Sequence, residues 1–93
     1  MNSAIRQRLV EAAKDIQMRE ILTFIYRDHP QGASFEGLKD MLFIHDNFDE
    51  SRLKQLVEEK VLSFDGQRYK IAAGARQVLD SDPVILMDEF LRG

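Results

Sequence analysis

Apolar residues near the start of the chain recur every three or four positions. They are Ile5, Leu9, Ala12, Ala13 and Ile16. This spacing gathers them on one face of an α-helix. A second apolar series with the same spacing runs on to Tyr26, and Asp15, between the two series, has a side chain that can cap a new helix. The pattern therefore predicts either one long bent helix over about 3–28 or two helices that meet at Asp15.

A clear break follows, and another helical pattern begins after it. In the break, His29-Pro30-Gln31-Gly32, the proline keeps the preceding residue out of the α region and the glycine permits a turn. Ser34 can then cap a second helical segment. The apolar face of this segment consists of Phe35, Leu38, Met41 and Leu42. Residues 43–48 lose the helical period and are predicted to form an irregular turn.

Apolar residues at helical spacing predict a further helix over about 50–60, and either Asp49 or Asn47 can cap its start. The period then changes from 3.6 to 2 in two short runs that flank Asp65-Gly66. An Asp-Gly pair between alternating runs is among the strongest short-range signals for a β-hairpin. We therefore expect a hairpin within 61–71.

A two-residue turn at Asp65-Gly66 would pair Phe64 with Gln67 and Leu62 with Tyr69. The side chains expected on the buried face are Leu62, Phe64, Tyr69 and Ile71, and those expected on the solvent face are Ser63, Arg68 and Lys70.

The end of the chain is predicted to be helical again, first over about 72–79 and then over 81–93. The second helix has a clear start signal, since Asp82 can cap it and Pro83 suits its first position. Its apolar residues spread over more than one face, which is typical of a helix with two packing partners. They are Val84, Ile85, Leu86, Met87, Phe90 and Leu91.

Length and composition limit the fold to one domain, residues 1–93, mainly α with a small β-hairpin. The net charge is −3, and residues 77–93 hold one base and four acids, so that residues 1–76 are neutral. A strongly basic nucleic-acid-binding protein would have a surplus of bases, although a neutral body can still carry a basic face.

The sequence contains no clear set of metal-binding or catalytic residues. There is no cysteine, and the two histidines, His29 and His45, stand 16 residues apart in turn regions. The carboxylate pairs Asp49-Glu50 and Asp88-Glu89 are adjacent along the chain, an arrangement that does not aim two carboxylates at one bond. We expect no metal, no cofactor and no enzymatic activity.

The sequence gives no sign of a membrane or an export signal. Its longest apolar run outside the alanines, 84–87, is far below the roughly 18–20 residues that cross a bilayer. The first six residues contain no hydrophobic signal segment. We expect an intracellular, cytoplasmic protein without a membrane partner.

The predicted order of three helices, a hairpin and a closing helix resembles the winged helix-turn-helix domain, over about residues 15–80. The most specific part is Asp49–Leu79, where Glu58-Glu59-Lys60 and two apolar residues lead into the first strand of the hairpin. On this resemblance, 15–80 is a winged-helix core, 1–14 an N-terminal helical extension and 81–93 a C-terminal helix.

The resemblance implies a small DNA-binding protein, a transcription regulator, that reads duplex DNA with helix 50–60 and the wing 61–71. The residues that it places against DNA are Ser51, Arg52, Lys54 and Gln55 on the helix, with Arg68 and Lys70 on the wing. Arginine suits guanine, glutamine suits adenine, and the wing cations suit phosphates. If it binds DNA, the protein would be associated with the nucleoid.

A second interpretation is a winged-helix adaptor that binds protein and no DNA. Three glutamates, Glu50, Glu58 and Glu59, lie on or beside the helix that would read DNA, and the wing tip Asp65-Gly66 is acidic. These charges oppose contact with a polyanion.

The two ends of the chain allow either a homodimer or packing within one chain. A homodimer is favoured, with terminal helices crossing between subunits. Burial of several large apolar side chains would stabilise either arrangement, and a two-fold dimer would also place two reading helices for half-sites about one DNA turn apart. The residues expected at the dimer interface are Ile5, Leu9, Val84, Met87, Phe90 and Leu91.

Overall fold

The computed structural model describes residues 3–42 and 49–87, and these residues are mainly helical with one two-stranded antiparallel hairpin, as predicted. The elements in chain order are α1 Ser3–Ala13, α2 Ile16–Thr23, the π-helical turn η1 Phe24–Asp28, α3 Phe35–Leu42, α4 Ser51–Glu58, β1 Leu62–Phe64, β2 Tyr69–Ile71, α5 Ala73–Ser81 and the 3-10 helix η2 Pro83–Leu86. The turn predicted for 43–48 lies outside the described residues.

Asp15 divides the N-terminal region into two helices, which settles the alternative that the sequence left open. Its Oδ1 atom accepts hydrogen bonds from the backbone N–H groups of Gln17, at 2.9 Å, and Met18, at 3.3 Å. These amides belong to the first turn of α2 and have no partner within the helix, so the side chain caps it. η1 then continues α2 as far as the break at His29.

The next two helices also begin at capping side chains that the sequence predicted. The Oγ atom of Ser34 accepts from the N–H of Gly37 at 3.0 Å, at the start of α3. The Oδ1 atom of Asp49 accepts from the N–H of Ser51 at 2.9 Å, at the start of α4. Both caps depend on neighbours within three residues, and such local contacts are accessible to sequence reasoning.

α4 ends at Glu58, two residues before the end predicted for it. Lys60 has a φ of 69°, which is left-handed, so the helix cannot continue through it. The turn is closed by hydrogen bonds from Lys60 N to Val57 O, at 3.1 Å, and from Val61 N to Leu56 O, at 2.9 Å. This is a Schellman motif, which satisfies the last carbonyls of the helix and directs the chain into β1.

The hairpin forms where predicted, but its register differs by two residues. Phe64 pairs with Tyr69, not with Gln67, and Leu62 pairs with Ile71. The connection is longer because Asp65 Oδ1 accepts from the N–H groups of Gln67, at 2.9 Å, and Arg68, at 2.8 Å. These bonds hold residues 65–68 as a four-residue turn in place of the predicted two-residue turn.

A shift of two residues leaves every side chain on its predicted face, because side chains alternate along a strand. Leu62, Tyr69 and Ile71 are buried as expected. Phe64 is the exception and is 41% exposed. It lies at the outer end of the hairpin, where its ring stacks on that of Tyr69 with 4.5 Å between the centroids.

The segment before α3 joins the edge of the hairpin. Ala33 N donates to Tyr69 O at 2.9 Å, and Tyr69 N donates to Ala33 O at 2.8 Å. The chain approaches closely because Gly32 has no side chain: a Cβ atom there would lie 2.8 Å from Lys70 Cγ. These bonds attach the start of α3 to the wing.

The C-terminal region differs from the prediction. The described part of the helix predicted for 81–93 is the short η2, and Met87 after it is extended. Asp82 makes no capping hydrogen bond with its side chain, and its carboxylate forms an ion pair with Arg6 of α1. The sequence predicted the local cap and not this contact between residues far apart in the chain.

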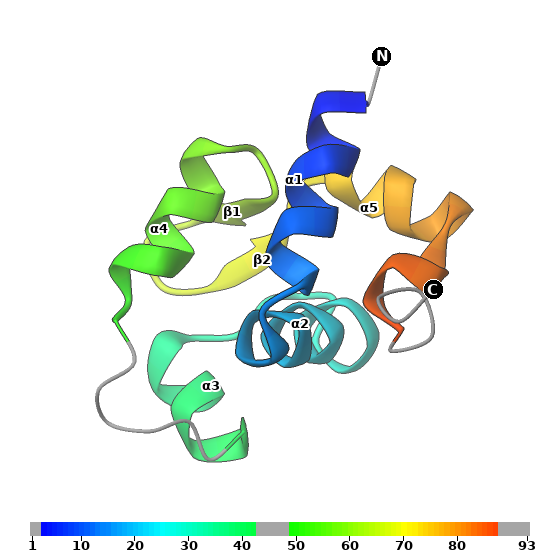
Figure 1. Ribbon diagram of the computed structural model, residues 1–93. Coiled ribbons are helices and arrows are strands. Elements are labelled where there is room, and N and C mark those ends of the chain that lie inside the picture. Colours follow the sequence, from blue (N-terminus) through cyan, green and yellow to red (C-terminus); the bar gives the residue numbers. More distant parts are fainter. Residues whose placement is uncertain (1–2, 43–48, 88–93) are drawn as a thin grey trace.

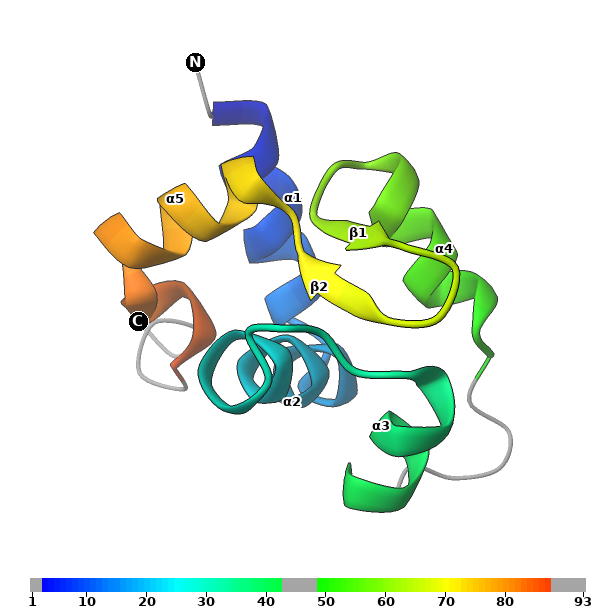
Figure 2. The same ribbon diagram turned by 180° about the vertical axis from the view of Figure 1, so that it is seen from behind.

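The core gathers side chains from each of these elements. α1 packs against α5 and η2, and Leu9 and Ile85 are fully buried. Figures 1 and 2 show, from opposite sides, α1 between α5 on one side and the hairpin with α4 on the other. Within one chain, α1 thus packs on α5 and η2.

Candidate nucleic-acid interface

α4 is amphipathic, and its outward face carries every helix residue that the sequence predicted against DNA. Leu53 and Leu56 anchor the helix in the core. Ser51, Arg52, Lys54 and Gln55 are exposed, and so is Glu58 at the end of the helix. The hydrophobic stripe thus turns these side chains to solvent, where another molecule can reach them.

The wing lies next to this helix. β1 packs against α4, and Figure 1 shows the hairpin beside it. Arg68 and Lys70, the two wing residues predicted against DNA, are both exposed. The aliphatic parts of their side chains lie over Gly32, so the cations extend from the wing near the start of α3. Helix and wing together therefore present an exposed polar surface.

Arg52 has a partner within its own chain. Its guanidinium Nη2 atom donates to Asp15 Oδ2, and the two side chains remain 44% and 38% exposed. The hydrogen bond from Arg52 is the main reason why the pKa of Asp15 lies below its usual value, and the two capping amides add to the effect. No spacing along the chain indicates this pair, since 37 residues separate its members.

A second contact, equally hidden in the sequence, joins α4 to the wing. The Tyr69 hydroxyl donates to Glu50 Oε2 at 2.8 Å, and the Tyr69 side chain is fully buried. Burial and this carboxylate raise the pKa of Tyr69 above its usual value. Glu50, one of the three glutamates that oppose DNA contact, therefore fixes the start of α4 against β2.

The acidic wing tip also has a structural role. Backbone hydrogen bonds, first from Arg68 and then from Gln67, hold the pKa of Asp65 below its usual value. The charges of Lys70 and Arg68 act in the same direction. The carboxylate therefore stays ionised beside the two wing cations and offsets part of their charge.

The whole surface is balanced in charge. Between residues 49 and 71 the acids are Asp49, Glu50, Glu58, Glu59 and Asp65, and the bases are Arg52, Lys54, Lys60, Arg68 and Lys70. On α4 itself, Gln55 Nε2 donates to Glu59 Oε2 at 3.3 Å. Positive groups are present at the predicted positions, but they alternate with carboxylates.

Metal and membrane features can be assessed for residues 3–42 and 49–87. Within these ranges no three metal-ligating side chains gather in one place, and no helix has the length and apolar character to span a bilayer. His29 packs on Phe24, with ring centroids 4.4 Å apart. His45 lies outside the described residues.

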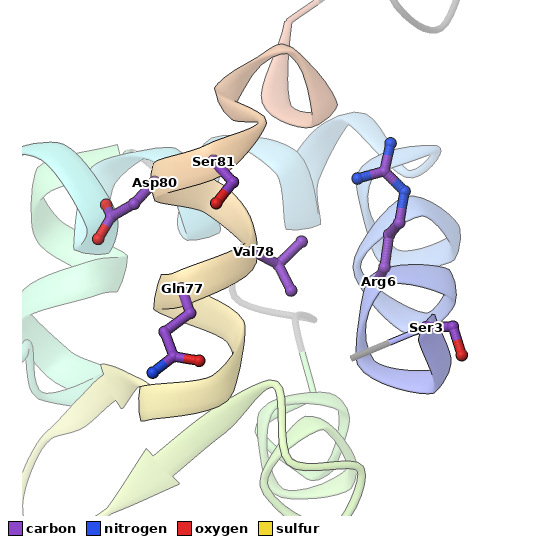
Figure 3. Close-up of a pocket in the computed structure, with 6 residues that line it drawn as sticks. All are labelled: Ser3, Arg6, Gln77, Val78, Asp80 and Ser81. Atoms are coloured by element: carbon purple, nitrogen blue, oxygen red, sulfur yellow. The ribbon is translucent and has the colours of Figure 1, made fainter. Parts of the chain in front are cut away.

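A hollow lies between α1 and α5, on another side of the molecule (Figure 3). Its volume is about 650 Å³. Ser3 and Arg6 line it from α1, and Gln77, Val78, Asp80 and Ser81 of α5 line it from the opposite side (Figure 3). Arg6 is the cation in this hollow, and it is paired with Asp82.

The residues predicted at a dimer interface are not equivalent. Leu9 is fully buried in its own chain, Ile5 and Val84 are partly buried, and Met87 is 48% exposed. Phe90 and Leu91 lie outside the described residues. Met87 is thus the described member of this set with the most surface left for a second subunit.

No family model, curated protein or solved structure matches this chain.

Proposed function

We propose that this chain is a small winged-helix DNA-binding protein, a transcription regulator that reads duplex DNA with α4 and the wing. The observation that carries the proposal is the exposure of all six predicted contact residues on one helix and the hairpin that packs beside it. The order α2, α3, α4, hairpin and α5 agrees with the domain that the sequence resembles.

Each part of this surface has a role that its chemistry suits. Ser51, Lys54 and Gln55 would meet base edges and phosphates from α4, since an α-helix fits the major groove. Arg68 and Lys70 would bind phosphates from the wing, where cations release counterions from DNA. The balanced charge predicts modest and salt-sensitive affinity. The protein would act in the cytoplasm, at the nucleoid, with no cofactor and no catalytic activity.

Replacing the two wing cations tests this proposal. In Arg68→Ala/Lys70→Ala, we expect the affinity for a fluorescent duplex to fall at least tenfold at about 50 mM salt, because two phosphate contacts are lost. The slope of log K against log salt should decrease by about 2. Fluorescence anisotropy at several salt concentrations measures both quantities.

Arg27→Ala is the matched control, because Arg27 is an exposed cation on η1, outside α4 and the wing. It should retain nearly wild-type affinity. Equal affinities of the wild type and the double variant would refute the assignment of the wing.

The balance of acids and bases over 49–71 favours a second candidate, a winged-helix adaptor that binds protein. An adaptor would show no duplex binding even at about 50 mM salt, where electrostatic attraction to DNA is strong. Absence of binding by the wild type under those conditions would favour the adaptor over the regulator.

We also propose a homodimer, in which Met87, an exposed apolar residue in the C-terminal region, meets a second copy. Met87 is 48% exposed, and burial of such a side chain would favour association. Light scattering coupled to size exclusion should give twice the 10.8 kDa mass of one chain. A particle of one chain's mass at micromolar concentration would contradict the dimer.

A further inference from the structure

Asp15 divides its two oxygen atoms between two tasks. Oδ1 accepts the amide hydrogen bonds of Gln17 and Met18 and so caps α2. Oδ2 accepts from the guanidinium of Arg52, at the first turn of α4. The cap requires an oxygen atom but no negative charge, whereas the attraction for Arg52 depends on the charge. The two tasks can therefore be separated by mutation.

The ion pair is exposed enough to be exchanged. The Arg52 side chain is 44% exposed and that of Asp15 is 38% exposed. Water screens such a pair, so it contributes little to stability and a phosphate or a guanine edge can replace the carboxylate.

The surroundings place this pair at one edge of the proposed DNA surface. A groove between α1 and α4 is lined by charged side chains of both signs, Arg8, Arg52, Glu11 and Glu59, and by the neutral Gln55. Arg8 Nη1 donates to the backbone oxygen of Glu59 at 3.1 Å, and Lys14 Nζ lies 3.3 Å from Glu11 Oε1. Two carboxylates in this region engage residues predicted to contact DNA: Glu59 Oε2 accepts from Gln55 Nε2 at 3.3 Å, within α4 and its end, and Asp15 Oδ2 accepts from Arg52, between two different elements.

We infer that Asp15 is a positioning residue that holds the Arg52 guanidinium against the junction of α1 and α2 and competes with DNA for it. The inference rests on the proposed function. Duplex DNA must displace Asp15 before Arg52 can reach a base or a phosphate. The chain thus contains an internal competitor that lowers its affinity for DNA.

Asp15→Asn separates the two tasks, because asparagine caps a helix as well as aspartate does. We expect the variant to bind a 20-base-pair duplex two- to fivefold more tightly than the wild type, the range that corresponds to an exposed ion pair. Fluorescence anisotropy at about 50 and 150 mM salt measures the change. Asp15→Ser, which also keeps a capping oxygen, should behave in the same way.

A double-mutant cycle with Arg52→Gln distinguishes this role from the general effect of removing a negative charge. In the Arg52→Gln background, Asp15→Asn should leave the dissociation constant unchanged. An equal gain in both backgrounds would overturn the inference, since a charge effect would not need Arg52. A loss or no change on Asp15→Asn in the wild-type background would overturn it too.

The same titrations separate this inference from the proposed function. If the wild type binds and Asp15→Asn gains nothing, only the role of Asp15 fails. If neither the wild type nor either Asp15 variant binds duplex at about 50 mM salt, the proposed function fails and the competition fails with it. Circular dichroism melting of each variant shows whether the cap, and with it the fold, is retained.

Discussion

Tyr69 links the core, the wing and the candidate interface in one side chain. Its ring is fully buried and stacks on Phe64, its backbone pairs with Ala33, and its hydroxyl reaches Glu50 at 2.8 Å. Few residues can satisfy a large apolar body and a polar tip together, and tyrosine is one of them. The position of α4 relative to β2 therefore depends on this one hydrogen-bonded ring.

The pKa of Tyr69 is raised in the folded protein, first by burial and then by Glu50. Because the pKa of Tyr69 is higher in the folded than in the unfolded state, its protonated hydroxyl stabilises the fold. This contribution is fully present below the pKa of the unfolded state, near 10, and is lost as the pH rises above it. We expect Tyr69 to ionise only as the protein unfolds in alkali. Absorbance at 295 nm reports tyrosine ionisation and circular dichroism reports unfolding. Following both signals against pH tests whether Tyr69 ionises in the same pH range in which the protein unfolds.

Tyr69→Phe is the control, because it leaves Tyr26 as the only tyrosine. Hydrogen bonding to Asp80 raises the pKa of Tyr26 as well, but Tyr26 is partly exposed and should ionise before unfolding. Ionisation of both tyrosines near pH 10 in the folded wild type would contradict the account of Tyr69.

At the scale of elements, the wing is held by its turn and by its approach to the segment before α3. Gly32 and Gly66 both have positive φ, at 106° and 100°. A Cβ atom on Gly66 would meet nothing within 4 Å, whereas one on Gly32 would lie 2.8 Å from Lys70 Cγ and 3.0 Å from Arg68 Cβ. The two glycines therefore have similar backbone conformations, but only Gly32 lies close to neighbouring atoms.

Alanine substitution at the two glycines should separate these effects. We expect Gly66→Ala to lower the free energy of unfolding by about 1 kcal/mol, the cost of the backbone conformation. Gly32→Ala should lower it by about 2–4 kcal/mol, because the clash with the wing adds to that cost. Urea denaturation measures both, and equal losses would show that the close approach is not important for stability.

Local signals account for what the sequence predicted well. Apolar spacing located the helices, and Asp15, Ser34 and Asp49 cap them through amides no more than three residues away. The Asp-Gly pair located the turn of the hairpin. Its register was wrong because the side chain of Asp65 accepts two hydrogen bonds that lengthen the turn.

Long-range contacts account for what sequence reasoning missed. The exposure of the six candidate residues could be predicted from the apolar pattern of the helix and the hairpin, but their partners within the chain could not. The pairs Arg52 with Asp15, Glu50 with Tyr69 and Arg6 with Asp82 each join different elements. No spacing rule connects such residues, so the sequence could not show that part of the candidate surface is engaged within the chain.

At the scale of the whole molecule, the candidate interface and the packed terminal elements α5 and η2 lie in different places. α5 and η2 pack with α1, while α4 and the wing lie on the other side of α1 (Figures 1 and 2). A second copy could therefore bind near Met87 and leave α4 exposed. The described part of the C-terminal region, residues 77–87, holds the two acids Asp80 and Asp82 and no base. If the proposed function is correct, repulsion by these carboxylates would favour binding of DNA on the side of α4.

The most direct test of the central claim is to titrate the isotope-labelled protein with a short duplex at about 50 mM salt and to follow every backbone amide by NMR. The account predicts that the largest shifts lie in residues 51–58 and 63–70, and that they disappear as salt is added. Shifts confined to α1, α5 and η2, or no shifts at all, would contradict it.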